Sequence, residues 1–163
     1  IDWGAPITLV GETRDEVADA QRELARIGID KLAAAATGKP EELAADPAQL
    51  RSTATASFTD LAAAQSGQQQ NGLPLPDVIL DVRTNNEYGD SHVDNAVHIP
   101  LYELTSRAGE LPSGTIWVHC GSGYRAAVAA SLLERDGRTD VVVVDDHFDV
   151  AADSGVRMAG NGP

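Results

Sequence analysis

Four consecutive valines, residues 141–144, constrain the fold more than any other feature of this 163-residue chain. Such a run is apolar on both faces, which is typical of a central strand in a parallel sheet. Residues 78–80 and 115–118 have the length and composition of further buried strands, residues 97–101 alternate as a strand does, and residues 126–133 form a helical pattern. Because strands alternate with helices, we expect an α/β fold on an open, mostly parallel sheet with helices on both faces.

The start of the chain shows a separate pattern of one short apolar run and one amphipathic helix. Thr13 and Glu16 have the spacing of a helix capping box, and Gly28 stands where the helix is expected to end. The length of the chain fits one complete domain with part of a second.

The charge of the chain excludes several classes of partner. Twelve basic residues against 25 acidic ones give a formal net charge of −13. Such a field repels phosphate groups, so we expect no nucleic-acid partner and no anionic membrane partner. No apolar run approaches the roughly 20 residues that a membrane-spanning helix needs.

Cys120 is the only cysteine, which excludes an internal disulfide and a structural zinc site made of several thiolates. The four histidines show neither HxH nor HExxH spacing, so we expect no bound metal. Because disulfides are rare in reducing compartments, the single thiol favours a cytoplasmic location.

The segment from Cys120 to Arg125 has the composition of a reactive site. It follows a buried strand and precedes a helix, and ligands of open parallel sheets bind beyond the carboxyl ends of the strands. Gly121 and Gly123 allow a tight turn whose N–H groups point inward, and the helix N-terminus and the Arg125 charge also favour a thiolate. The alternative is that Cys120 is a small buried apolar residue, as free cysteines often are.

These residues resemble a known family. The run CGSGYR, residues 120–125, is similar to the active-site loop C-x-x-G-x-R of the rhodanese sulfurtransferases. The resemblance covers residues 51–160. Further matches in chain order are Asp81-Val82-Arg83, Glu87, Tyr88, His92, Ala96, Ile99 and Pro100.

The resemblance implies a sulfurtransferase that carries sulfane sulfur as a persulfide on Cys120 and passes it from a small-molecule donor to an acceptor. Arg125 would orient the loop or the donor, and Asp81 and Arg83 would fix the base of the loop. No cofactor is implied in this chain beyond the covalent persulfide. The N–H groups of residues 121–125 would bind the sulfur, and the loop residues between Cys120 and Arg125 are Gly121, Ser122, Gly123 and Tyr124.

Loop length distinguishes this site from phosphatases and arsenate reductases of the same fold class, whose loop is C-x5-R. Only four residues separate Cys120 from Arg125, which favours a sulfur atom over a phosphoryl group. Because Arg125 is the only basic residue in the loop, we expect a thiol persulfide such as glutathione persulfide as the donor, or else thiosulfate.

Asp145 and Asp146 depart from the family pattern, which usually has two glycines there. Carboxylates near the pocket would disfavour a thiolate and repel anionic donors. They favour the alternative of a non-catalytic sensing or docking module that keeps the fold.

The first 45 residues resemble only the C-terminal half of a rhodanese, with Gly11-Glu12-Thr13-Arg14 where its loop would lie. Because this part lacks a cysteine, it resembles a degenerate repeat. The resemblance therefore implies a partial, catalytically degenerate rhodanese-like segment at residues 1–50 and a rhodanese domain at residues 51–163. The order of parts resembles the C-terminal region of proteins that join a metallo-β-lactamase-fold persulfide dioxygenase or hydrolase to tandem rhodanese domains. The resemblance implies an upstream catalytic domain as a partner, and an incomplete sheet edge would be covered in a homodimer.

Overall fold

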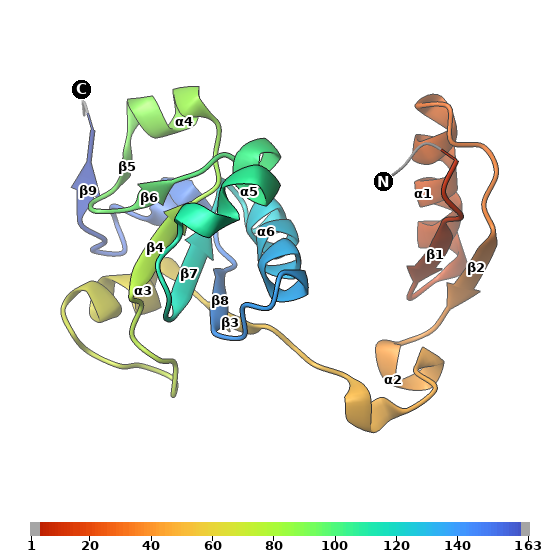
Figure 1. The fold of residues 1–163 in the computed structure, drawn as a ribbon, viewed down its shortest axis with the longest axis horizontal. Coiled ribbons are helices and arrows are strands. Elements are labelled where there is room, and N and C mark those ends of the chain that lie inside the picture. The colour runs from red at the N-terminus through yellow and green to blue at the C-terminus, as the bar shows by residue number, and fades with distance from the viewer. Residues whose placement is uncertain (1–3, 161–163) are drawn as a thin grey trace. The chain divides into compact units, whose positions relative to one another are not determined.

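The computed structural model describes residues 4–160, which divide into two units between Ser52 and Thr53. The sequence placed the division between residues 50 and 51. Each unit has its own sheet, and both are drawn in Figure 1.

The second unit contains a five-stranded sheet in the order β3-β8-β7-β4-β6, and all of its strand pairs are parallel. The predicted α/β fold with a mostly parallel sheet is therefore confirmed. The elements are β3 (Ala54–Ala56), α3 (Phe58–Gln65), β4 (Val78–Asp81), α4 (Asn85–Asp90), β5 (His92–Val93), β6 (Val97–His98), α5 (Leu101–Arg107), η2 (Ala108–Glu110), β7 (Ile116–His119), α6 (Tyr124–Arg135), β8 (Val141–Val144), η3 (Phe148–Val150) and β9 (Met158–Ala159).

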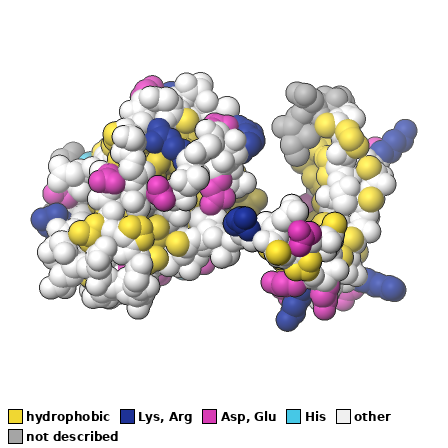
Figure 2. Space-filling view, turned by 60° about the horizontal axis from the view of Figure 1, so that its bottom comes forward, with side chains coloured by type: hydrophobic (Ala, Val, Ile, Leu, Met, Phe, Trp, Pro, Cys, Tyr) yellow, Lys and Arg dark blue, Asp and Glu magenta, His cyan; other side chains and the backbone are white. Residues whose placement is uncertain are grey.

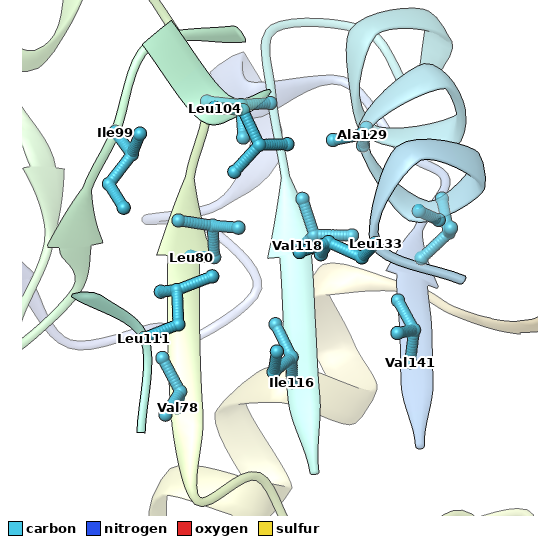
Figure 3. Close-up of a cluster of buried hydrophobic side chains, with 14 of the residues drawn as sticks. Val78, Leu80, Ile99, Leu104, Leu111, Ile116, Val118, Ala129, Leu133 and Val141 are labelled. Atoms are coloured by element: carbon cyan, nitrogen blue, oxygen red, sulfur yellow. The ribbon is translucent and has the colours of Figure 1, made fainter. Parts of the chain in front are cut away.

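Apolar side chains cover both faces of this sheet. On one face, Leu104 of α5 and Leu133 of α6 pack against alternate residues of β4, β7 and β8, as Figure 3 shows. On the other face, Phe58 and Leu61 of α3 pack against Trp117 and the remaining residues of the strands. All four valines of β8 are buried, because β8 lies between β3 and β7 with apolar side chains on each side.

Two local features of the second unit differ from the sequence prediction: a shorter strand at residues 97–101 and an additional two-stranded ribbon. The strand β6 covers only Val97 and His98, because Pro100 follows closely and Leu101 already begins α5. A two-stranded antiparallel ribbon of β5 and β9 pairs Val93 with Met158, and no sequence signal pointed to it.

The first unit is a small βαβ unit. Its elements are β1 (Thr8–Gly11), α1 (Arg14–Arg26), β2 (Ala34–Thr37), α2 (Pro40–Leu43) and η1 (Pro47–Gln49). The predicted capping box is present, since Thr13 Oγ1 accepts from the Glu16 N–H and Glu16 accepts from the Thr13 N–H. Strands β1 and β2 pair in parallel, and Val17 is the one buried residue among those that the structure describes in this unit.

Candidate active site

Cys120 lies directly after β7 and its side chain has no solvent exposure. Its Sγ accepts a hydrogen bond from the Ala126 N–H at 3.4 Å, in the first turn of α6. The sequence placed the sulfur-binding N–H groups at residues 121–125, whereas this contact comes from the residue after them. The sulfur therefore faces the helix N-terminus, where backbone N–H groups and the helix dipole favour negative charge.

Two glycines give the loop its shape for different reasons. Gly123 has φ +84°, and a β-carbon there would overlap the carboxylate of Asp145. At Gly121 a β-carbon would lie 2.9 Å from Arg125 Nη2, so the guanidinium rests against the loop backbone. Between them Ser122 is exposed, and Tyr124 is 76% exposed.

Arg125 forms a bidentate ion pair with Glu87, with both N···O distances at 2.7 Å. The hydrogen bonds from Arg125 hold the pKa of Glu87 well below its usual range, and the same bonds raise the pKa of Arg125. Glu87 also accepts from the Thr84 N–H and hydroxyl, which caps α4. The predicted full positive charge at the loop is thus largely neutralised by a carboxylate, and the pair ties α4 to the loop.

Asp81 and Arg83 form a buried ion pair on the sheet face opposite Cys120. The Arg83 guanidinium donates to both Asp81 oxygens at 2.7–3.0 Å and to the Ser91 carbonyl at 2.7 Å. The guanidinium carbon of Arg83 also lies 3.5 Å from the ring centroid of Phe148. The backbone N–H of Phe148 in turn donates a hydrogen bond to the Gly121 carbonyl. Contacts therefore run from the ion pair through Phe148 to the Cys120 loop, and neither charged residue is in the loop.

His119 is completely buried beside this ion pair. Neither ring nitrogen has a hydrogen-bond partner among the described residues, and Nε2 lies 3.7 Å from Asp81 Oδ2. The ring stacks on Phe148 and meets Phe58 edge-on. Burial lowers the pKa of His119 to about 4, against a smaller opposing effect of the Asp81 charge.

The two aspartates that depart from the family pattern have different surroundings. Asp146 accepts hydrogen bonds from the His147 N–H and the Phe58 N–H, so it is held at the start of α3. Asp145 is exposed and its carboxylate lies against Gly123 in the loop. Of the two carboxylates, Asp145 is the one at the candidate site.

Within residues 4–160, no cluster of three or more potential metal ligands occurs. No helix in the same range has the length and apolarity to cross a bilayer. On the face drawn in Figure 2, acidic and basic side chains are scattered over the second unit without forming a single basic patch.

Comparison with known proteins identifies the fold and the family. The sequence pattern of the rhodanese-like domain matches residues 59–152, which are more than half of the chain. The chain belongs to the rhodanese-like family. The rhodanese-like domain of an Anabaena protein aligns with a TM-score of 0.55 at 22% identity, over 69% of this chain and 81% of that one, which supports the fold.

Curated relatives of this rhodanese-like chain have names connected with sulfur transfer. A putative sulfur carrier protein of Bacillus subtilis (strain 168) is 42% identical over 67 residues, covering 40% of this chain and 36% of the relative. The thiosulfate sulfurtransferase of Escherichia coli (strain K12) is 35% identical over 65 residues, covering 38% and 62%. The chain thus spans less than two thirds of each of these relatives.

Three residues that contact the candidate site were given no role by the sequence. Glu87 is 38 positions from Arg125, and its spacing from Thr84 marks only a helix start. His119 and Phe148 support the loop from the opposite sheet face. The sequence did contain a signal for the burial of His119, because His119 directly continues the apolar run of β7 and the residues of such a strand are buried.

We expect Gly123→Ala to destabilise the second unit by about 1–2 kcal/mol from the left-handed backbone alone, and by more through overlap with Asp145. Gly137→Ala is the matched control, because Gly137 has φ +91° and no atom within 4 Å of a β-carbon there. Urea unfolding of each variant, alone and with Asp145→Gly, separates the two effects. Asp145→Gly should relieve only the overlap part of the cost at residue 123 and leave the cost at residue 137 unchanged; equal relief at the two positions would contradict the overlap.

Proposed function

We propose that the second unit is a sulfurtransferase that carries sulfane sulfur as a persulfide on Cys120. The observation that carries the proposal is the hydrogen bond from the Ala126 N–H, in the first turn of α6, to Sγ of Cys120, which begins a six-residue loop ending at Arg125. Membership of the rhodanese-like family and the sulfur-transfer names of its relatives support it.

The proposed reaction has two displacements at sulfur. The Cys120 thiolate attacks the terminal sulfur of the donor, the donor S–S bond breaks, and the donor thiolate leaves with the electron pair of that bond. A thiol or other nucleophilic acceptor then attacks the outer sulfur of the Cys120 persulfide, which regenerates the thiolate. No net oxidation occurs. The N–H groups at the start of α6 stabilise negative charge on sulfur in both steps.

The charges around the loop favour a thiol persulfide over thiosulfate as the donor. A dianionic donor needs unpaired positive charge, and the guanidinium of Arg125 is already paired with Glu87. Asp145 adds a negative charge beside Gly123. A low-molecular-weight persulfide such as glutathione persulfide brings less charge to the reacting sulfur.

A second candidate is a non-catalytic sensing or docking module. The complete burial of Cys120 favours it, because attack on a donor requires the loop to admit the donor sulfur. The Arg125–Glu87 ion pair, which reduces the positive charge at the loop, favours it as well.

Intact mass after incubation with a persulfide donor separates the two candidates. Sulfur transfer predicts a gain of roughly 32 Da, one sulfur atom, that a thiol acceptor removes and that is missing in Cys120→Ser. No gain, together with a thiol that fails to react in the folded protein, would support the docking module. Hydrolysis of an aryl phosphate would contradict both.

The remaining parts of the proposal concern the whole protein. The strand-helix-strand order of β1, α1 and β2 matches that of β7, α6 and β8, with parallel pairing in each case, and this supports a degenerate repeat in the first unit. The upstream metallo-β-lactamase-fold domain, the homodimer and the cytoplasmic location stay predictions.

A further inference from the structure

A cavity of about 220 Å³ lies beside the Cys120 loop, between β3 and α6. Thr55 of β3 and Val143 of β8 line one side, and Gly123 and Tyr124 of the loop line the other. Asp145 lies at the loop end of the cavity. Because Gly123 and Tyr124 belong to the cavity lining and follow Cys120 closely, a molecule in the cavity lies beside the Cys120 loop.

The cavity is suited to a cation at its loop end. Asp145 is the only charged side chain in the lining, and no ion pair to it occurs in the described part of the chain. Tyr124 supplies an exposed aromatic ring, which attracts cations, and Thr55 supplies a hydroxyl. The neighbouring Arg125 does not compete for Asp145, because Glu87 binds both of its terminal nitrogens.

The position of Asp145 beside the loop suits a small ligand. The carboxylate of Asp145 lies against Gly123, which belongs to the loop between Cys120 and Arg125. An aminothiol persulfide has only two carbons between its sulfur and its ammonium group. An ammonium group held at Asp145 would therefore keep the persulfide of such a molecule close to Gly123 and Tyr124 of the loop.

We propose that this cavity binds the ammonium group of an aminothiol persulfide and that Asp145 is the residue that selects for it. The inference rests on the proposed transfer of sulfur to Cys120 and specifies the class of donor. Asp145 acts through charge: it attracts a cationic donor and repels an anionic one at the same reacting sulfur.

The test is a donor series that varies charge at constant reactive group: the persulfides of cysteamine, 2-mercaptoethanol and 3-mercaptopropionate. We expect the rate of Cys120 persulfide formation, followed by intact mass, to fall in that order, with about three- to tenfold between successive donors. Asp145→Asn should flatten the series, and the exposed Asp153→Asn, which removes the same charge elsewhere, should preserve it. A flat series in the unchanged protein, or an unaltered order in Asp145→Asn, would overturn the proposal.

A binding measurement keeps the inference distinct from the proposed function. In Cys120→Ser, cysteamine itself should shift the backbone amide resonances of Gly123 and Tyr124, and Asp145→Asn in that background should abolish the shifts. If no donor modifies Cys120 and these shifts are still seen, the sulfurtransferase proposal fails and the ammonium site stands. If donors modify Cys120 and cysteamine causes no shift, the ammonium site fails.

Discussion

Replacing Arg83 with methionine should lower the free energy of unfolding of the second unit by about 3–5 kcal/mol. Arg83 is 3% exposed and Asp81 is fully buried, so the substitution leaves a carboxylate without its counter-ion inside the protein. The Ser91 carbonyl loses its donor, and the ring of Phe148 loses the guanidinium stacked on it. Methionine restores part of the packing volume but none of these polar contacts.

Urea unfolding measures this loss, with Arg107→Met as the matched control. Arg107 also pairs with two carboxylates, Glu103 and Glu110, but its side chain is 36% exposed. Water solvates those carboxylates when the arginine is removed, so the control should change stability little. Equal losses in the two variants would show that burial of the Arg83 pair is not the source of the effect. Removal of the Arg83 guanidinium should also loosen the Cys120 loop, because the guanidinium packs on the ring of Phe148 and the Phe148 N–H donates to the Gly121 carbonyl.

The central part of the fold could be predicted because local patterns and tertiary structure agree there. The valines of β8 are apolar on both faces since strands flank β8 on each side and apolar side chains cover both faces, and the sequence carries that information directly. The turn at the Cys120 loop could also be predicted from the sequence, because a segment with two glycines between a buried strand and a helix has few other conformations. The capping box of α1 was found by spacing alone.

The polar contacts around the site could not be predicted in the same way. Glu87 and Arg125 meet only because α4 and the loop lie at the same end of the sheet, and no spacing in the sequence encodes that meeting. The pairing of Arg125 with Glu87, which largely neutralises the positive charge expected at the loop, was missed for this reason. The differing surroundings of Asp145 and Asp146 likewise depend on the strand-to-turn geometry after β8.

Lowering the pH from 7.5 to 5 should cost the second unit about 2 kcal/mol of stability through His119 alone. The pKa of His119 is lowered to about 4 by burial, whereas a histidine in the unfolded chain titrates near 6.5. The folded state therefore keeps the ring neutral while the unfolded chain takes up a proton. The stability contributed by the neutral His119 ring is fully present above about pH 6.5. It is lost as the pH falls towards 4, by about 1.4 kcal/mol for each pH unit and about 3 kcal/mol in all.

His119→Phe tests this origin, because phenylalanine can stack on Phe148 and has no group to protonate. Free energies of unfolding measured at pH 7.5, 6.0 and 5.0 should fall steeply in the unchanged protein and stay nearly level in the variant. Exposed His147, replaced by glutamine, provides the control and should retain the steep fall. Glu87, with its lowered pKa, adds acid sensitivity only below about pH 4.5, where its unfolded form protonates, so it does not obscure the window. A steep fall that persists in His119→Phe would assign the acid sensitivity to other groups and would show that the buried ring gains a proton without cost.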